Sequence, residues 1–404
     1  MKIVKHTVDL CKVVLALGIG KLLKRYKPNR DIWLISEREM EAEDNGYHLY
    51  RYIREHHPEQ KVFYIINKKS KAYKRIEKYK LIINQNSFKH YIYYFMAEKH
   101  ISAFQFFGVP DTPWIWKLEE KNIIKNKKIF IQHGITKEFL PFLTYKQTKY
   151  NLFACGAKPE YDYIKSCYGY PEGGVAYLGF CRFDNLHDYK EKRQILIMPT
   201  WRQWLGMTNK ENKIEQDCKR FTQSEYFKAY QSLLNNERLN KLLEAYEYNL
   251  LFYPHPEMQR FLSEFKVVSP YMKICNRGDC ILQEVLKESN IVITDYSSIA
   301  FDCGYMRKPV IYYQFDQEKY YKHHFEKGYF DCKTDGFGPV LKNETKLIDE
   351  LKEYMRRENN KAIYIEKGEK FFPIYDKNNC KRTYEAIKKI EQGGNEIEKD
   401  FNSY

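Results

Sequence analysis

The sequence predicts an α/β protein made of two doubly wound domains, each built on a parallel sheet. Three observations lead to this fold class. The chain has 404 residues, which is more than one hydrophobic core usually organises. Short apolar runs alternate with longer charged, helix-like stretches, which is the pattern of βαβ units. Finally, unusual polar side chains follow directly after several of the apolar runs, where the ligands of such sheets bind.

Two series of apolar runs define the two domains. The first series predicts strands at residues 31–35, 61–66, 99–103 and 128–132, with a helix at 47–55. The second series predicts strands at 194–198, 248–252, 291–294 and 309–313, with helices at 222–248 and 281–288. A polar stretch at 184–193 separates the two series. We therefore predict domains at 29–185 and 186–390, preceded by a short segment at 1–28 and followed by a tail at 391–404.

The first segment is strongly basic. Residues 1–30 carry eight Lys or Arg and one acid, Asp9, within a chain of net charge +15. Its apolar centre is too short to span a bilayer, and no convincing signal-peptide cleavage site follows it. An amphipathic helix lying on the anionic inner leaflet fits this composition, as does a helix packed on the protein body. We expect the first case, a peripheral protein on the cytoplasmic face of the cell membrane.

Several functional classes lack their sequence signals. The chain has no GxxxxGK[ST] motif, no GxGxxG after a strand and no GxSxG motif. Its basic residues are scattered without a helix-turn-helix or zinc-finger pattern, so nucleic-acid binding is not expected. The ten cysteines include no CxxC pair, which argues against a structural zinc site.

A histidine and a glycine follow the predicted strand at 128–132. His133 can act as a general base near neutral pH, and Gly134 lets the backbone turn tightly or approach a ligand. A buried histidine bonded to a backbone carbonyl would show the same pattern.

The second domain has similar residues after its strands. Thr200 and Arg202 supply a hydroxyl and a guanidinium that can grip phosphate, and a surface salt bridge is the alternative for Arg202. His255 stands between two prolines, which suits a rigid imidazole that stabilises charge on a phosphoryl group, and a turn that simply contains a histidine is the alternative.

The run at 294–302 is the strongest single signal. Here an apolar strand ends in an acid and two hydroxyls, and a helical stretch begins at once. Such a helix start can bind an anion, although a plain N-cap has the same form. The candidate residues are Thr294, Asp295, Ser297, Ser298 and Asp302.

Together these motifs resemble the CDP-glycerol glycerophosphotransferase family, the teichoic-acid primases and polymerases. The resemblance runs from about residue 31 to residue 390. It rests on the stretches at 44–47, 133–134, 199–202, 255–256 and 294–302, then 308–310, Asp316, 338–339 and Arg382. The commoner family form has Trp where this chain has Gln132, and different residues at 135–137.

The resemblance implies a GT-B-like fold of two Rossmann-type domains, with an acceptor domain first and a CDP-donor domain second. It implies transfer of glycerol phosphate or ribitol phosphate from a CDP-activated donor to a lipid-linked teichoic-acid-like or capsular polymer, with release of CMP. His133 would be the base and His255 would stabilise the pyrophosphate, helped by Arg202, Ser297 and Ser298. Asp44 and Asn45 would lie on the acceptor side. No bound cofactor or metal is expected, and a divalent ion at the pyrophosphate is left open.

Two other functions fit parts of the pattern. A GT-B glycosyltransferase would use a nucleotide sugar in the same fold, since fold does not fix chemistry. A basic scaffold without catalysis would bind anionic lipid or polymer and would lose that binding at high salt.

Overall fold

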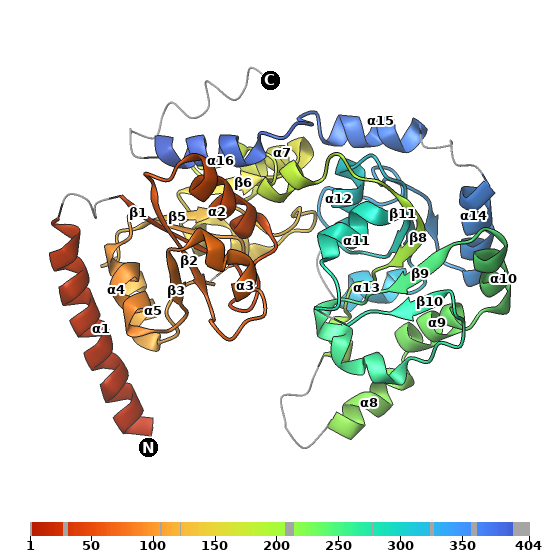
Figure 1. Ribbon diagram of the computed structural model, residues 1–404, viewed down its shortest axis with the longest axis horizontal. Coiled ribbons are helices and arrows are strands. Elements are labelled where there is room, and N and C mark those ends of the chain that lie inside the picture. Colours follow the sequence, from red (N-terminus) through yellow and green to blue (C-terminus); the bar gives the residue numbers. More distant parts are fainter. Residues whose placement is uncertain are drawn as a thin grey trace. The chain divides into compact units, whose positions relative to one another are not determined.

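The computed structural model of the chain divides into two compact units, each described here by itself (Figure 1). Unit 1 takes Met1–Ile135, Pro141–Asn185 and Asp376–Tyr404, and unit 2 takes Thr136–Leu140 and Leu186–Tyr375. The structure describes residues 2–26, 31–105, 107–121, 123–206, 214–276, 278–323, 327–356 and 362–390. The predicted tail at 391–404 and parts of the predicted first segment lie outside these residues.

Unit 1 is built on a seven-stranded sheet in the order β3-β2-β1-β4-β5-β6-β7, in which every pair is parallel. Its strands are β1 (Ile32–Ser36), β2 (Lys61–Ile66), β3 (Ile82–Asn84), β4 (Lys99–Ser102), β5 (Lys127–Phe130), β6 (Leu152–Cys155) and β7 (Val175–Tyr177). The strand order reverses between β1 and β4. This is the topological switch point at which doubly wound sheets bind ligands.

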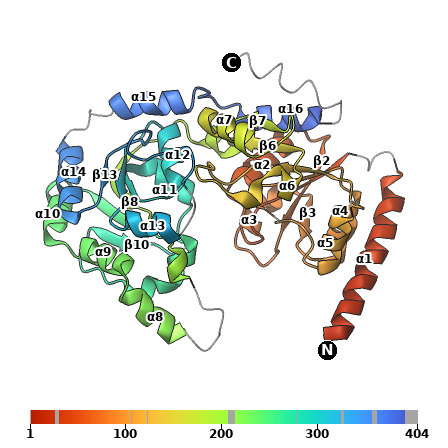
Figure 2. The same cartoon turned by 180° about the vertical axis from the view of Figure 1, so that it is seen from behind.

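Helices cover both faces of this sheet because side chains alternate along each strand. On β1, Trp33 and Ile35 enter one apolar core, while Ile32 and Leu34 enter the other. The helical elements of unit 1 are α1 (Lys2–Lys24), α2 (Asn45–His56), α3 (Tyr73–Ile76), η2 (Glu77–Tyr79), α4 (Phe88–Met96), α5 (Pro113–Glu120), η3 (Pro141–Leu143), α6 (Tyr145–Thr148), α7 (Lys158–Cys167), η4 (Cys181–Asn185) and α16 (Asn379–Lys389). Helix α1 runs along α4 and α5 at the edge of the unit (Figure 2).

Two segments belong to a different unit from the one that the sequence predicted. Helix α16 was expected in the second domain but packs in unit 1, where Tyr384 and Ile387 join the core around Trp33. The carboxylate of Asp184 fixes its start by accepting hydrogen bonds from the backbone of Asn379 at 2.8 Å and Cys380 at 2.9 Å. Conversely, the short segment at 136–140 was expected in the first domain and lies with unit 2. There the backbone of Lys137 packs so closely on Gly328 that a Cβ at residue 328 would come within 2.1 Å of the Lys137 oxygen.

Unit 2 repeats the doubly wound plan with a six-stranded parallel sheet in the order β10-β9-β8-β11-β12-β13. Its strands are β8 (Lys192–Ile197), β9 (Asn249–Phe252), β10 (Met272–Ile274), β11 (Ser289–Thr294), β12 (Val310–Tyr313) and β13 (Val340–Leu341). Its helical elements are η5 (Gln203–Leu205), α8 (Ile214–Thr222), α9 (Glu225–Leu234), α10 (Glu237–Ala245), η7 (Pro256–Glu264), α11 (Leu282–Glu288), α12 (Ile299–Tyr305), α13 (Gln317–His323), α14 (Glu344–Arg356) and α15 (Ala362–Phe371). The switch point lies between β8 and β11.

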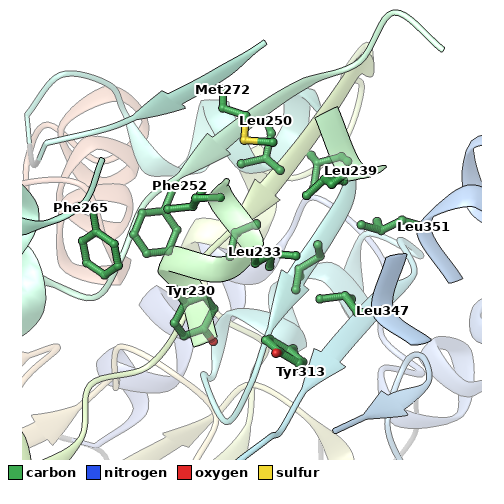
Figure 3. Packing of buried hydrophobic residues seen from close by; sticks show 14 of the residues in the cluster. Tyr230, Leu233, Leu239, Leu250, Phe252, Phe265, Met272, Tyr313, Leu347 and Leu351 are labelled. Atoms are coloured by element: carbon green, nitrogen blue, oxygen red, sulfur yellow. The ribbon is translucent and has the colours of Figure 1, made fainter. Parts of the chain in front are cut away.

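The helix predicted at 222–248 is two helices, α9 and α10, which pack into the core of unit 2. Figure 3 shows Leu233 of α9 and Leu239 of α10 packed with Phe252 of β9 and Leu347 of α14. Between the two helices Asn236 caps α10 by accepting from the backbone of Leu239 at 3.1 Å. The local cap therefore divides one periodic apolar pattern into two helices.

The fold class predicted from the sequence is confirmed, since both units are parallel α/β sheets covered by helices. Every predicted strand coincides with an observed one to within a few residues. The strands that the sequence did not predict are short, from two to four residues: β3, β6, β7, β10 and β13. Within the described part of the chain, no helix combines the length and the apolar character that crossing a membrane requires.

Candidate active site

The backbone around His133 is held rigidly at the carboxyl edge of the unit 1 sheet, the edge where the carboxyl ends of the strands lie. The side-chain amide of Asn45, at the start of α2, donates to the carbonyls of Ile131 at 3.2 Å and Gln132 at 2.8 Å. The Arg182 guanidinium donates to the carbonyl of His133 itself at 3.1 Å. Gly134 follows, partly exposed. Donors therefore fix the chain from Ile131 to His133, and the ring is presented from an ordered turn.

The His133 ring lies in a short aromatic stack. It stacks on Phe104, with ring centroids 4.2 Å apart and planes 15° apart, and the Arg38 guanidinium lies 4.5 Å from the Phe104 centroid. The pKa of His133 is lowered to about 4 by removal from bulk water and by the charges of Arg38 and Arg182, against a hydrogen bond to the Ala103 backbone. Because the His133 side chain remains exposed, we attribute the lowered pKa mainly to the two guanidiniums and less to removal from water.

These contacts define the protonation state of His133. At neutral pH the ring is uncharged, since its pKa lies well below 7. One ring nitrogen bonds to the backbone of Ala103, which as a carbonyl acceptor holds the ring proton on that nitrogen. The other nitrogen then has its lone pair available as an acceptor, as a general base requires. The sequence left open a base or a carbonyl-bonded histidine. The ring is carbonyl-bonded and also exposed, and the role of base stays a prediction.

Asp44 and Asn45 brace the turn that carries His133. Asp44 caps α2 and pairs with the Arg182 guanidinium at 2.9 Å. Burial raises the pKa of Asp44, and Arg182 opposes that rise. Asn45 is fully buried, and its side-chain oxygen accepts from the backbone of Arg182 at 3.0 Å. Asn45 therefore does not fit the predicted contact with the acceptor substrate, because it is buried and its polar atoms already bond to backbone groups.

Sequence reasoning missed Glu37, which directly follows β1. Its carboxylate accepts from the backbone of Glu43 at 3.0 Å, Asp44 at 3.0 Å and Tyr47 at 2.6 Å, and so folds the loop that leads into α2. Burial, followed by the charge of Asp44, raises the pKa of Glu37 to about 8. An acid at the end of a predicted strand was the signal that could have found it.

Arg202 occupies a different place from the one that the sequence predicted. It is fully buried, and its guanidinium bonds to Asp316 at 2.7 and 3.1 Å, to Asp295 at 2.9 Å and to the Thr200 carbonyl at 2.8 Å. Burial would lower the pKa of Arg202, but the two carboxylates hold it well above its ordinary value. A side chain without exposed surface cannot grip a phosphate, so Arg202 holds loops together.

The same cluster fixes the loops after β8 and β11. The buried Asp295 carboxylate accepts from the backbone of Thr200 at 2.8 Å and Tyr296 at 2.6 Å. The buried Thr294 hydroxyl donates to the Met198 carbonyl at 2.7 Å. Asp295 and Thr294 are therefore structural partners at the switch point, and neither is exposed to a ligand.

His255 is partly exposed at the carboxyl edge of the unit 2 sheet. Its Nδ1 accepts from the backbone of Glu257 at 3.2 Å, so the neutral ring carries its proton on Nε2. Its own backbone donates to the Pro199 carbonyl at 3.1 Å, which ties the loops after β8 and β9 together. The ring can therefore donate from Nε2, whereas His133 offers an acceptor.

Ser297 and Ser298 precede α12 and are both partly exposed. The Ser297 hydroxyl accepts from the backbone of Ile299 at 3.4 Å, and no side-chain capping bond is present at Ser298. Helix α12 has only seven residues, so its dipole is weak and the hydroxyls are the stronger feature. Asp302 lies on the same helix but is buried, with 3% of its surface exposed, and does not fit a ligand contact.

Each unit thus carries its own group of polar residues at the carboxyl edge of its sheet, beside its switch point. No cluster of three or more His, Cys, Asp or Glu able to hold a metal occurs among the residues that the structure describes.

The sequence profile of the CDP-glycerol:poly(glycerophosphate) glycerophosphotransferase family matches residues 20–389. The chain belongs to this family. It is 35% identical over 376 residues to the minor teichoic acid biosynthesis protein GgaB of Bacillus subtilis, covering 92% of this chain and 41% of that protein. It is also 25% identical over 363 residues to the teichoic acid poly(glycerol phosphate) polymerase of the same species, covering 81% of this chain and 44% of that protein. The chain therefore spans less than half the length of these two relatives.

Solved structures agree with this membership at the level of fold. The wall teichoic acid polymerase TagF matches with a TM-score of 0.64 and 16% identity, over 97% of each chain. A complex of Staphylococcus aureus MnaA with UDP matches with a TM-score of 0.55 and 12% identity, over 89% of this chain and 97% of that one. The likeness to TagF confirms the GT-B class of fold for this chain.

Proposed function

We propose that this glycerophosphotransferase transfers glycerol phosphate or ribitol phosphate from a CDP-activated donor to a hydroxyl of a lipid-linked, teichoic-acid-like or capsular polymer. The observation that supports this most is His133. It is a neutral, exposed imidazole with one nitrogen held as an acceptor, in a chain whose family is defined by this transfer. Unit 1 would be the acceptor unit and unit 2 the donor unit.

In the proposed reaction His133 takes the proton of the acceptor hydroxyl as its oxygen attacks the β-phosphorus of the donor. A new P–O bond forms to the acceptor, the anhydride P–O bond breaks, and CMP leaves with the electron pair. His255 would donate from Nε2 to the pyrophosphate oxygens, and Ser297 and Ser298 would donate from their hydroxyls. Fixed donors of this kind stabilise the charge that develops during phosphoryl transfer.

Thr200 and the buried residues of unit 2 would contribute to donor binding indirectly, by holding the loops that carry the exposed donors. Thr200 has 8% of its surface exposed, and Asp295 holds its backbone. Arg202 and Asp295 would keep the loops after β8 and β11 in register, so that His255 and the serines face one donor. They would act as positioning residues, and phosphate contacts would come from the exposed groups.

A polyanionic acceptor is supported by the loop after β2. The loop after β2 and the start of α3 carry four exposed lysines, Lys68, Lys69, Lys71 and Lys74. This loop is bonded to the loop that precedes Asp44, since the backbone of Asn67 donates to Glu39 at 2.7 Å. Positive charge at the same carboxyl edge of the unit 1 sheet would attract the phosphates of a growing polymer and speed its association.

Peripheral binding to the inner leaflet is supported by the outer face of α1. Val13 and Ala16 are buried against unit 1, while Val8, Leu15, Ile19 and Leu22 form an exposed apolar stripe. Lys12 and Lys21 flank this stripe and are exposed. An apolar stripe between cations is the composition of helices that lie in an anionic membrane surface.

A paired substitution tests this membrane face. We expect Leu15→Glu with Leu22→Glu to abolish sedimentation with phosphatidylglycerol vesicles while leaving turnover of a soluble acceptor unchanged. The same change in net charge on the exposed face of α10, made by Lys241→Glu alone, should have no effect on sedimentation. Full vesicle binding by the α1 variant would refute the membrane assignment.

The reaction itself is tested by the nucleotide that leaves. The protein is incubated with CDP-glycerol, CDP-ribitol or UDP-sugars, with a Gram-positive membrane extract as acceptor. We expect CMP from one CDP-polyol, and loss of that product in His133→Ala. Release of UDP would assign a glycosyltransferase, and no turnover with any donor would favour a binding protein.

A further inference from the structure

Gln132, the residue before His133, adopts a backbone conformation that its side chain disfavours. Its φ is +54°, in the left-handed region. A residue with a Cβ pays about 1–2 kcal/mol there, and Asn, Asp and Gly are the usual occupants. Other contacts must therefore hold Gln132 in this state.

The side chain of Gln132 supplies one of these contacts. Its amide donates to the Ala154 carbonyl at 2.7 Å and to the Glu160 carboxylate at 3.2 Å. The other oxygen of Glu160 accepts from the backbone of Gly156 at 2.7 Å. Glu160 has 0% and Gln132 1% of its surface exposed, so the bonds are shielded from water. They tie the segment after β5 to the neighbouring strand β6 and to the first turn of α7.

A second contact holds the main chain of Gln132. Its carbonyl accepts from the Asn45 amide at 2.8 Å, and Asn45 is the first residue of α2. Segments from distant parts of the sequence thus hold this one residue in place. If the side-chain grip were lost, Gln132 could relax to negative φ, which would rotate the peptide that leads into His133.

We propose that Gln132 and Glu160 form a positioning pair that fixes the His133 ring for proton transfer. This inference rests on the proposed function of His133 as base. The pair touches no reacting atom and acts through the backbone turn. A displacement of about 1 Å at a reacting group costs about 10²-fold in rate, so a modest rotation of this turn is enough to lower turnover.

The test replaces the donor without changing its shape. In Gln132→Glu a carboxylate faces the Ala154 carbonyl and Glu160, and neither can accept from it. We expect kcat for CMP release to fall about 10- to 100-fold with the KM for the CDP-polyol unchanged. Gln147→Glu, an exposed change in the same unit, should keep both constants.

Two further variants separate positioning from folding. Gln132→Asn tolerates the left-handed backbone but is one methylene too short to span the same contacts, so it should fold and still lose kcat. The exchange Gln132→Glu with Glu160→Gln restores a donor facing an acceptor and should recover part of the loss. Wild-type kcat in both single variants at residue 132 would overturn the proposal.

An activity-independent measurement distinguishes this inference from the proposed function. In histidine-labelled protein, NMR of the His133 ring should show a changed pKa and changed ring signals in Gln132→Glu and Gln132→Asn, and wild-type signals in Gln147→Glu. If the wild-type protein releases no CMP but this shift is seen, the proposed function fails and the positioning pair stands. Unchanged His133 signals in both variants would overturn the pair whatever the activity.

Discussion

The two units hold the loops at the carboxyl edges of their sheets with charged groups, but they place these groups differently. In unit 1 the charged groups lie around a partly open turn, where Asp44 and Arg182 brace the backbone of an exposed His133. In unit 2 the charged groups are sealed inside, where Arg202 joins Asp295 and Asp316 without any exposed surface. The partly exposed residues left there carry neither a carboxylate nor a guanidinium: they are His255, Ser297 and Ser298.

This difference shows that the residues that hold the loops rigid need not be the residues that contact a ligand. A buried ion-pair cluster fixes loops but cannot contact a ligand, so unit 2 would bind through the His255 imidazole and the two serine hydroxyls. A partly open network fixes a turn and still leaves one ring available, so unit 1 would use that ring for proton transfer. Three predictions probe this contrast.

The largest expected effect is at His133. His133→Ala should lower kcat for CMP release by about 10²–10⁴-fold, because the proposed general base is removed. The KM for the CDP-polyol should stay near the wild-type value, since we propose that unit 2 binds the donor. His255→Ala, measured in the same steady-state assay, should instead weaken donor binding as well as kcat. The same loss of donor affinity in both variants would contradict the division between the two edges.

The next effect concerns stability and is expected in unit 2. Arg202→Met leaves Asp295 and Asp316 buried without their cation, and breaking such a pair costs about 3–5 kcal/mol. Urea unfolding of the variant should show this loss as a lower midpoint. Arg193→Met removes the exposed pair with Glu247 and should shift the midpoint little. Comparable midpoints for the two variants would show that the buried cluster does not hold unit 2 together.

The smallest effect is a pH dependence that belongs to unit 1. Because the pKa of Glu37 is raised to about 8 in the folded protein, the folded state binds a proton that the unfolded chain has lost. Its contribution to stability is therefore fully present below the ordinary pKa of a glutamate and is lost as pH rises toward 8. Glu37→Gln cannot titrate, so its free energy of unfolding should fall less steeply between pH 5 and pH 8. Parallel curves for variant and wild type would contradict the raised pKa.

Much of the architecture could be predicted because it depends on local patterns. Apolar runs of five or six residues, such as 61–66, carry their own evidence for a buried parallel strand. Short strands such as β13, with two residues, have no such pattern and exist only because a neighbouring strand pairs with them. Helix α16 was assigned to the wrong domain because its partner Asp184 lies 195 residues away in the sequence.

The sequence predicted which residues lie at the carboxyl edges of the sheets, but it did not predict which of them are exposed and which are buried. Polar residues after strands identified His133, His255 and Ser297, which the structure leaves exposed or partly exposed at the carboxyl edges. The same rule selected Arg202, Asp295, Thr294 and Asp302, which are buried. Sequence position shows which residues reach an edge, but burial depends on what other segments place over them.

The sequence by itself determined the two doubly wound units and the family, because strand periodicity and strand-end motifs are local properties of the chain. Only the tertiary structure decided which polar groups face solvent and which are paired inside. It also showed that Gln132 is held in a left-handed turn by Asn45 and Glu160. The physical reason is that hydrogen bonding and burial of a side chain are set by residues far away in sequence, brought together when each sheet forms.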